Sequence, residues 1–337
     1  MSAPHLVIVI PCLNEEAHLP ALLDTLCADP AAANARIVVA DGGSTDASIE
    51  IVRQRGAADP RVTLLSNPQR IQSAGANLAV RMFGEEAEFL VRVDAHAAYP
   101  ADYISQLLRA QAESGADSVT VSMHAVARRG ACFQRAAAAA QNSVLGAGGS
   151  PHRRSGARRW VDHGHHALFT LAAFRAVGGY DESFTHNEDA ELDARLKQQG
   201  ARILLAADIR MDYFPRATPS SLAHQYFRYG QGRARTAIKN KRRLESRQLL
   251  PIAVAPAVAL AALAPLTPWA VLPAAVWLST SLFYGVWLGI KARSVCAAAA
   301  GLPAAIMHLA WSSGFLWEAA RMRRASAPSA DIQHNQA

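Results

Sequence analysis

The 337-residue sequence predicts an α/β protein with a mostly parallel sheet, helices on both faces of that sheet, and transmembrane helices near the C-terminal end. Short apolar, β-branched runs alternate with stretches of helical periodicity over about the first two thirds of the chain, which is the pattern of βαβ units. Residues 249–317 then contain only three charged or histidine residues, Lys291, Arg293 and His308. So apolar a stretch favours a membrane over a soluble core, since it has almost no polar face.

The first βα unit opens the chain. Residues 6–10 form a continuous apolar run, typical of a strand that is buried on both faces, and we expect Pro11 to end it. Asn14 is then a suitable N-cap for a helix, with Glu15 and Glu16 in the first turn where the helix dipole favours acids. The run is too short for a signal peptide, so we expect the domain to stay in the cytoplasm.

Further units follow the same pattern. We expect strands at residues 36–40, 62–65, 88–93, 118–122 and 203–205. We expect helices at residues 47–55, 71–82, 101–114, 167–177 and 188–199. Residues 128–166, rich in Arg, His, Gly and Ser, fit a long loop over a site. In such a sheet the functional groups gather at the C-terminal ends of the strands.

Three acidic motifs are candidates for function, and each also has an ordinary structural interpretation. Asp41 opens a Gly-rich loop and could contact a nucleotide, or it could simply cap a turn. Asp94 and His96, at the end of an apolar strand, could bind a divalent metal or form a capped turn. Glu188 and Asp189 begin a helix, where two acids ordinarily complement the helix dipole.

The order of these motifs is more informative than any one of them. The chain carries Pro11-Cys-Leu-Asn14-Glu15-Glu16, Asp41-Gly-Gly-Ser-Thr-Asp46, Asp94-Ala-His96, Gly178-Gly-Tyr-Asp181 and Asn187-Glu188-Asp189. In this order, over residues 5–235, they resemble the inverting glycosyltransferases of family 2, which have the GT-A (Rossmann-like) fold. The chain as a whole resembles the succinoglycan-biosynthesis-type glucosyltransferases, which act on lipid-linked oligosaccharides in bacteria.

The resemblance implies a role for each motif. The nucleotide-sugar donor would be bound by Pro11, Asn14, Glu15, Asp41 at the uracil, Arg70 and Asp94. Asp94 would hold Mg²⁺ or Mn²⁺ on the diphosphate, with His96 as a second ligand. Asp189, with Glu188 beside it, would be the general base on the acceptor hydroxyl. A metal that neutralises the departing UDP and a carboxylate that deprotonates the nucleophile divide the chemistry in a reasonable way.

The chain departs from the family pattern at two positions. His96 stands where the family commonly has the second Asp of Asp-x-Asp, and imidazole suits Mn²⁺ better than the harder Mg²⁺. Asp41-Gly42 replaces a commonly doubled acid and leaves one carboxylate.

Two further groups point to the acceptor side. Gln225-Tyr-Phe-Arg228-Tyr229 resembles the Gln-x-x-Arg-Trp motif of processive synthases, although it could equally be the polar face of a helix. If it is functional, Arg228 would hold a diphosphate and Tyr229 would stack on a sugar. His165 lies in a histidine-rich stretch without a Cys or carboxylate at ligand spacing, so we expect it near the acceptor rather than in a metal cluster.

The C-terminal part predicts a membrane anchor. We divide the chain into a catalytic domain (1–235), a basic juxtamembrane linker (236–248), membrane-associated helices (249–320) and a polar tail (321–337). The basic linker indicates the cytoplasmic side of a bacterial inner membrane. Residues 249–266, 269–290 and 295–317 could each approach a span. Three spans would place Arg321, Arg323 and Arg324 outside, so one segment is expected to be re-entrant or interfacial.

Charge and cysteine content exclude some classes of function. The formal net charge of +7 comes without an aromatic-interleaved basic stripe, so we expect no nucleic-acid partner. The four cysteines, Cys12, Cys27, Cys132 and Cys296, have no metal spacing and no C-x-x-C pair. This pattern is typical of buried thiols in a reducing compartment, without a catalytic role.

The resulting hypothesis is a membrane-anchored inverting glycosyltransferase in exopolysaccharide biosynthesis. Its donor would be a UDP-sugar, with glucose as the expected hexose, and its acceptor a polyprenyl-diphosphate-linked saccharide. A processive polysaccharide synthase is one alternative, although such enzymes normally have membrane spans before the catalytic domain and we expect none before His5. A non-catalytic nucleotide-binding membrane scaffold is the other, motivated by His96.

Overall fold

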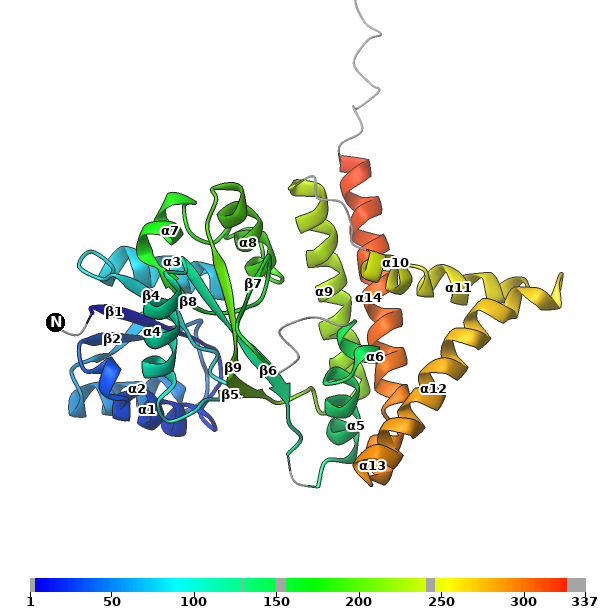
Figure 1. Ribbon diagram of the computed structural model, residues 1–337, viewed down its shortest axis with the longest axis horizontal. Helices are drawn as coiled ribbons and strands as arrows, with labels where there is room; N and C mark the ends of the chain where they lie inside the picture. The colour runs from blue at the N-terminus through cyan, green and yellow to red at the C-terminus, as the bar shows by residue number, and fades with distance from the viewer. Residues whose placement is uncertain (1–3, 129, 149–155, 241–245, 326–337) are drawn as a thin grey trace, which may run out of the picture.

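The computed structural model describes residues 4–128, 130–148, 156–240 and 246–325 (Figure 1). Most of the expected polar tail and part of the expected basic linker therefore lie outside the described residues.

A mixed sheet forms the centre of the domain that we expect to be catalytic, and its strands run in the order β3-β2-β1-β4-β8-β6-β9-β5, with β7 also paired to β9. The strands are β1 (Leu6–Cys12), β2 (Ala35–Asp41), β3 (Val62–Ser66), β4 (Phe89–Arg92), β5 (Ala97–Ala98), β6 (Ser118–Ala125), β7 (Arg159–Val161), β8 (His165–Thr170) and β9 (Ile203–Tyr213). Strands β1 to β4 pair in parallel, as expected for βα units. Strand β8 then pairs antiparallel with both β4 and β6.

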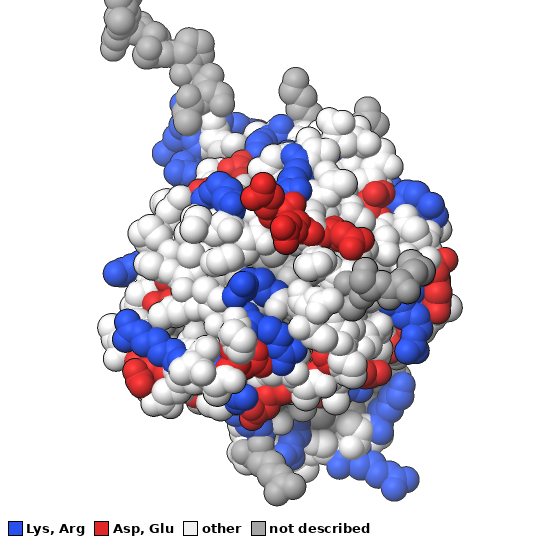
Figure 2. Space-filling view, turned by 90° about the vertical axis from the view of Figure 1, so that its left-hand side faces the viewer, with Lys and Arg blue, Asp and Glu red and all other residues white. Residues whose placement is uncertain are grey.

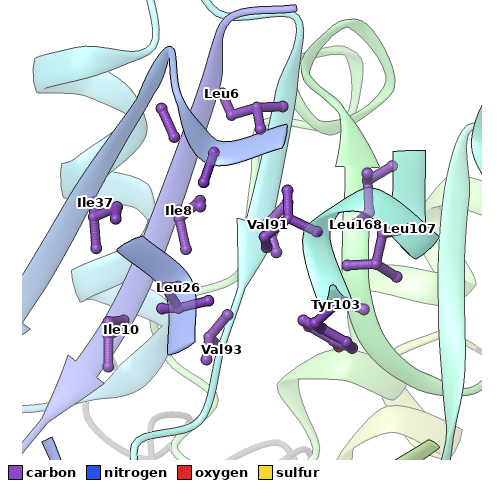
Figure 3. Close-up of a cluster of buried hydrophobic side chains, with 14 of the residues drawn as sticks. Leu6, Ile8, Ile10, Leu26, Ile37, Val91, Val93, Tyr103, Leu107 and Leu168 are labelled. Atoms are coloured by element: carbon purple, nitrogen blue, oxygen red, sulfur yellow. The ribbon is translucent and has the colours of Figure 1, made fainter. Parts of the chain in front are cut away.

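Helices cover both faces of this sheet, which confirms the predicted fold class. The helices of this domain are α1 (Leu19–Ala28), α2 (Ser48–Ala58), α3 (Gln72–Phe83), α4 (Tyr103–Ser114), α7 (Leu171–Ala176) and α8 (Glu188–Gln198), with a short 3₁₀ helix, η1 (Pro30–Ala32), after α1. On one face, α1 and α4 pack on alternate residues of β1 such as Ile8 and Ile10 (Figure 3). On the other face, α3, α7 and α8 pack on Val7 and Val9. Because both sets of β1 side chains are buried, the strand reads as a continuous apolar run.

Several element boundaries differ from the sequence predictions. Strand β1 continues through Pro11 to Cys12, and α1 begins only at Leu19. Asn14 is therefore not an N-cap: it has a φ of 56°, and its side-chain oxygen accepts a hydrogen bond from Thr45 N at 2.8 Å. Pairing with β2 extends β1 two residues beyond the predicted strand, since Pro11 pairs with Ala40 and Cys12 with Asp41.

Part of the predicted loop at residues 128–166 forms helices and strands. It contains α5 (Cys132–Gln141), α6 (Val144–Ala147) and β7, and β8 begins at His165. The first four residues of the predicted helix at 167–177 belong to strand β8, and residues 171–176 form the helix α7. These elements form through contacts with β9 and with the C-terminal helices, which sequence periodicity does not reveal.

The C-terminal part is a helical unit beside the catalytic domain (Figure 1). It contains α9 (Pro219–Lys239), α10 (Ser246–Ile252), α11 (Val254–Leu260), η3 (Ala261–Leu263), η4 (Pro268–Val271), α12 (Leu272–Ala292), α13 (Val295–Ala298) and α14 (Gly301–Ala325). Helix α9 passes without a break through position 235, the expected domain boundary.

Helix α14 packs in parallel along α9. A Cβ added to Gly230 would lie 2.1 Å from the Trp311 carbonyl oxygen, and one added to Gly314 would lie 2.0 Å from the Phe227 carbonyl oxygen. Glycine is thus required at both positions because the two backbones touch.

Two of the described helical stretches, Pro268–Ala292 and Val295–Arg324, are long and apolar enough to cross a membrane. The expected span at residues 249–266 is divided into short helices instead. The apolar helical stretch that they form, Leu249–Leu263, is too short to cross a membrane.

Two of the four cysteines are not thiols. Cys132 of α5 and Cys296 of α13 form a disulfide across 164 residues, which corrects the expectation of four free thiols. The pairing depends on the packing of α5 against α13 and therefore leaves no local sequence signal. Cys12 and Cys27 are free, and burial raises the pKa of the Cys12 thiol to about 11, so it is not a nucleophile at neutral pH.

Candidate functional site

A cavity of about 1140 Å³ lies between the catalytic sheet, α9 and α14. Nine of the predicted site residues line it: Arg70, Asp94, His96, His165, Glu188, Asp189, Gln225, Arg228 and Tyr229. The other four do not line it: Pro11 is in β1, Asn14 and Glu15 are in the loop that follows β1, and Asp41 is the last residue of β2. Motifs from distant parts of the chain thus meet around one space.

The guanidinium of Arg92 is the centre of this site. Arg92 is the last residue of β4, and it is 5% exposed. Its Nη1 lies 2.6 Å from Asp189 Oδ1 and 3.0 Å from Glu188 Oε1, while its Nη2 lies 3.5 Å from Asp94 Oδ1. One buried cation therefore holds the expected metal ligand and the expected base in a single network. Breaking such a buried network is costly because it leaves unpaired charges.

Asp94 is held in its charged form. Burial alone would raise the pKa of its carboxyl, but Arg92 and His165 keep that pKa well below its ordinary value. His165 Nε2 lies 3.4 Å from Asp94 Oδ2, and the backbone N–H of Asp94 donates to the Tyr99 hydroxyl at 2.8 Å. An ionised carboxylate facing a cavity is what binding a divalent cation requires.

The two acids at the start of α8 have different environments. Glu188 is 7% exposed, and burial raises the pKa of its carboxyl. Asp189 accepts hydrogen bonds on Oδ1 from Arg92 and, at 3.2 Å, from the Tyr180 hydroxyl. Its Oδ2 lies 3.9 Å from His165 Nδ1, and Asp189 is among the residues that line the cavity. Asp189 is thus oriented through one oxygen and offers the other to a ligand.

His165 lies between the two functional carboxylates rather than in a loop. It is the first residue of β8, and its two ring nitrogens face Asp94 and Asp189. The antiparallel pairing of β8 between β4 and β6 places it there. It therefore bridges Asp94 and Asp189, and its expected position near the acceptor stays a prediction.

His96 pairs with a carboxylate from another motif. Its Nδ1 lies 3.1 Å from Glu15 Oε1, and the other Glu15 oxygen lies 3.0 Å from His18 Nδ1. The hydrogen bond to Glu15 raises the pKa of His96. Glu15 therefore contributes by orienting this imidazole.

The loop after β2 is tightly built around Asp41. Its carboxylate accepts from Gly43 N at 2.8 Å and from Ser44 N and Oγ, as in an Asx-type turn. Ser44 Oγ in turn accepts from Asn14 N at 2.8 Å, which joins the first two motifs. The guanidinium of Arg70 lies against Gly43, since a Cβ there would be 3.3 Å from Arg70 Nη2.

Backbone strain marks the same motifs. Four described non-glycine residues have positive φ angles, and three of them, Asn14, Arg70 and Asn187, are in or next to the predicted motifs. Such conformations cost energy and persist where the surrounding contacts demand them, often at functional sites. The turn before α8 is similarly fixed, because a Cβ on Gly179 would lie 2.5 Å from Asn77 Oδ1.

A group of cations lines the opposite wall of the cavity. Burial and the nearby charges of Arg228, His224, Arg235 and Arg216 lower the pKa of His186 to about 4. Arg235 is paired with Glu318 at 2.5 Å, but no ion pair of Arg216 or Arg228 occurs among the described residues. This wall is therefore suited to bind an anion.

Three polar atoms at the cavity have no partner among the described residues: Gln141 Oε1, Asn187 Nδ2 and Gln225 Oε1. Gln225 donates through Nε2 to the hydroxyls of Tyr213 and Tyr229, at 2.8 and 3.0 Å. Buried polar atoms are normally paired, so these positions suit the hydroxyl groups of a bound sugar. The Gln225, Arg228 and Tyr229 motif is thus part of the cavity wall and not a solvated helix face.

Sequence reasoning missed Arg92 and its support. An arginine within an otherwise apolar strand was the available signal, because a buried charge needs partners. Tyr180, whose ring lies 5.6 Å from the Arg92 guanidinium, and Gln72, whose Oε1 lies 2.7 Å from Nη2, complete its environment. Both come from other segments and become visible only in the fold.

The residues present fit a divalent cation that also binds a diphosphate. Among the described residues, no group of three or more His, Cys, Asp or Glu side chains is arranged to hold a metal by itself. Mg²⁺ is commonly bound by one or two carboxylates together with substrate phosphates. Asp94, ionised and facing the cavity, provides that carboxylate.

Comparisons with known proteins agree with this geometry. The model of "Glycosyl transferase family 2" matches residues 7–176. The chain is 49% identical over 319 residues to the succinoglycan biosynthesis protein ExoA of Rhizobium meliloti (strain 1021), covering 94% of this chain and 96% of that protein.

Two solved structures share the architecture. The mannosyltransferase PcManGT from Pyrobaculum calidifontis, in complex with GDP-Man and Mn²⁺, has a TM-score of 0.57 at 19% identity, covering 94% of this chain and 88% of its own. GalNAc-T7 with UDP, GalNAc and Mn²⁺ has a TM-score of 0.52 at 13% identity, covering 68% and 48%. At these identities the likeness shows the GT-A fold alone. Taken together, the motifs, the fold and the family match show that the chain belongs to glycosyl transferase family 2 and is a glycosyltransferase.

Proposed function

We propose that the protein transfers glucose from UDP-glucose, with inversion, onto a polyprenyl-diphosphate-linked saccharide in bacterial exopolysaccharide assembly. The cavity carries this proposal, because it joins an acidic centre, a cationic wall and apolar helices in one space. The name of the relative, a succinoglycan biosynthesis protein, supports the polysaccharide class.

On the donor side, the loops after β1 and β2 would hold the nucleotide. Pro11, Asn14 and Asp41 would lie at the uridine, with the uracil contact made by the remaining lone pairs of the Asp41 carboxylate. Arg70, which lies against Gly43, would frame the base or the phosphates. Mg²⁺ or Mn²⁺ would be held by Asp94, with His96 as a second candidate ligand, and would neutralise the charge on the departing diphosphate.

On the acceptor side, Asp189 would be the general base. Its Oδ1 is fixed by Arg92 and Tyr180, so Oδ2 is left to accept the proton of the attacking hydroxyl. A base on the side opposite the leaving group produces inversion at the anomeric carbon. The buried carboxyl of Glu188 would keep the Arg92 guanidinium in place.

The lipid-linked acceptor is supported by the far wall of the cavity. Arg216 and Arg228 would bind its diphosphate, and Tyr229 would stack on its sugar. Pro251 of α10 and Trp311 of α14, in the apolar helical unit, also line the cavity. A membrane lipid could thus present its sugar to Asp189 without leaving the bilayer surface.

A donor screen tests this proposal. Purified protein, lipid-linked acceptor and either Mn²⁺ or Mg²⁺ are incubated with radiolabelled UDP-glucose, UDP-galactose or UDP-N-acetylglucosamine, and lipid-bound label is counted. Transfer from UDP-glucose is expected. An exchange of Glu85 for Gln, on the exposed surface, is the matched carboxylate control and should leave transfer unchanged. Nucleotide binding without transfer from any donor would overturn the proposal and favour a non-catalytic scaffold.

A further inference from the structure

The apolar helices α11 and α12 form a hairpin that leads away from the catalytic domain. In Figure 1 the two helices meet at an apex on the far side of α14 from the sheet. The chain has no Asp, Glu, Lys, Arg or His from residue 249 to residue 290. Near the apex, Leu266 is 84% exposed and Trp269 is 74% exposed. We propose that this hairpin enters only one leaflet of an anionic membrane and returns, so that no helix of the chain crosses the bilayer; this rests on the membrane association proposed above.

Both ends of α14 are tied to the catalytic domain, so α14 does not cross. At its start, α13 is joined to α5 by the disulfide between Cys132 and Cys296, and the two helices pack against each other. Near its end, Glu318 pairs with Arg235 of α9, and α9 is held to the catalytic domain by the ion pair of Lys239 with Glu191 of α8. A crossing helix would have these two ends on opposite sides of a membrane.

Helix α9 excludes a bilayer around α14 as well. It covers one side of α14, and it contacts the catalytic domain near both of its own ends. Gln225 donates to the Tyr213 hydroxyl of β9, and Lys239 pairs with Glu191 of α8 at 2.7 Å. A bilayer perpendicular to α14 would have to bury these polar groups and the cavity behind them in lipid, at a high free-energy cost.

The length of the free part of the hairpin fits one leaflet. On the α12 arm, the indole N–H of Trp277 donates to His308 of α14 at 3.3 Å. On the other arm, Ala255 N donates to Ser312 Oγ at 3.0 Å. Residues 268–276 project beyond these contacts, about 14 Å at 1.5 Å per helical residue. The hydrocarbon core of a bilayer is about 30 Å thick, so this reach is about half of it.

The charges are placed as this insertion requires. Lys291 and Arg293 lie at the α13 end of α14, and Arg321, Arg323 and Arg324 lie at its other end. All five lie near the base of the hairpin, where anionic headgroups would meet them. Trp287, whose ring lies 5.4 Å from Lys291 Nζ, and the exposed Trp317 are also near this level, where aromatic side chains favour the membrane interface.

This arrangement removes the conflict in the sequence-based topology. Three spans would place Arg321, Arg323 and Arg324 outside, and two spans would place Arg293 outside. A hairpin that returns keeps every basic residue on the cytoplasmic side, in agreement with the positive-inside rule. The opposite face of the molecule differs clearly, because Figure 2 shows acidic and basic residues mixed over it.

Single-cysteine labelling distinguishes the topologies. Leu266→Cys reports on the apex, Ala292→Cys on the base, Arg324→Cys on the end of α14, and Arg53→Cys on the catalytic domain as the cytoplasmic control; these positions are exposed. A membrane-impermeant maleimide is applied to spheroplasts, to inverted membrane vesicles and to detergent-dissolved vesicles, and the signal of the unsubstituted chain is subtracted.

We expect no labelling in spheroplasts. In inverted vesicles we expect labelling at positions 53, 292 and 324, and at position 266 only after detergent. Labelling of position 266 in spheroplasts would show three spans, and labelling of position 292 there would show two. Labelling of position 266 in inverted vesicles would show that the apex is outside the lipid. Each of these results overturns the proposal.

Protection of the apex by a second copy of the chain is a further outcome to exclude. Lipids brominated deep in the acyl chains should quench the fluorescence that is lost in Trp269→Phe. Protection from maleimide without this quenching would overturn the hairpin. Glucosyl transfer measured on the same vesicles reports separately on the proposed function, so that a wrong topology and a wrong activity give different results.

Discussion

The acid centre around Arg92 and the α11–α12 hairpin differ in the kind of side chains they contain and in what surrounds those side chains. At the centre, four ionisable side chains are almost buried, and each is held by an opposite charge within 3.5 Å. In the hairpin there is no charge, and large apolar side chains are exposed. The chain thus concentrates paired charge where a sugar phosphate would be handled and removes charge where lipid would be met. Mutations that exchange these properties should damage the two functions separately.

Loss of Asp94 should have the largest effect. Asp94→Ala removes the carboxylate that would hold the metal on the diphosphate, so we expect transfer to fall on the order of 10³-fold or more. His96→Asp, which restores the common Asp-x-Asp pattern, should keep transfer and shift the preference toward Mg²⁺. Initial rates with each metal measure both effects. Full activity in Asp94→Ala would remove this motif from the mechanism.

Arg92 should link activity and stability. Arg92→Met leaves Glu188 and Asp189 without their cation, so we expect kcat to fall about 10²-fold and the free energy of unfolding to fall by about 3–5 kcal/mol. Arg92 lowers the pKa of the neighbouring Glu188 carboxyl, so without the cation that pKa rises and the acid limb of the kcat–pH profile should move to higher pH.

Arg92→Lys keeps a positive charge but lacks the forked geometry of the guanidinium. Its kcat and its free energy of unfolding should therefore lie between those of the unsubstituted protein and those of Arg92→Met. An unshifted pH profile in Arg92→Met would show that Arg92 only stabilises the fold.

A charge at the hairpin apex should affect the membrane and not the chemistry. Leu266→Asp places a carboxylate inside the leaflet, at a cost of about 2.5–3.5 kcal/mol, so partition to anionic vesicles should weaken about 100-fold. Val295→Asp is the control, because Val295 is 91% exposed but lies at the base. Sedimentation with vesicles measures binding, and transfer to a short-chain acceptor in detergent should be unchanged. An equal loss of vesicle binding in Leu266→Asp and Val295→Asp would contradict the one-leaflet hairpin.

The smallest expected effect concerns His186 on the cationic wall. Its pKa is lowered from 6.5 to about 4 in the folded protein, so between these pH values the unfolded chain binds a proton that the folded chain does not. Stability from this residue is present above about pH 6.5 and is lost as the pH falls toward 4.

In His186→Gln the fall in melting temperature on acidification from about pH 7 to about pH 5 should be smaller by about 2–4 °C. An identical fall in melting temperature in His186→Gln and in the unsubstituted protein would show that the neighbouring cations do not act on His186.

The sequence predicted the parallel half of the sheet well because each strand there is buried on both faces and reads as an apolar run. Residues 6–10 and 36–40 were recognised for this reason. Prediction from the sequence failed at β7 and β8, because the pairing of these strands with distant strands overrides their local preference. The motif acids were found because a loop after a strand carries them, and the structure brings most of them to one cavity.

What the sequence did not reveal depends on contacts between distant segments. Arg92 could be read only as part of a strand until the fold placed Asp94, Glu188 and Asp189 around it. The disulfide joins helices 164 residues apart. Likewise, hydropathy identified apolar segments but could not show that α14 is held along α9 and does not stand alone in lipid.

The most direct test of the catalytic centre is the exchange of Asp189 for Asn, measured by transfer and by nucleotide binding in the same preparation. The side chain keeps its size but can no longer accept the proton of the acceptor hydroxyl. We expect glucosyl transfer to fall on the order of 10³-fold, while the affinity for UDP with Mn²⁺ stays within about twofold, since Asp94 and the loops after β1 and β2 are intact. Transfer at the unmodified rate in Asp189→Asn would contradict the assignment of Asp189 as the base.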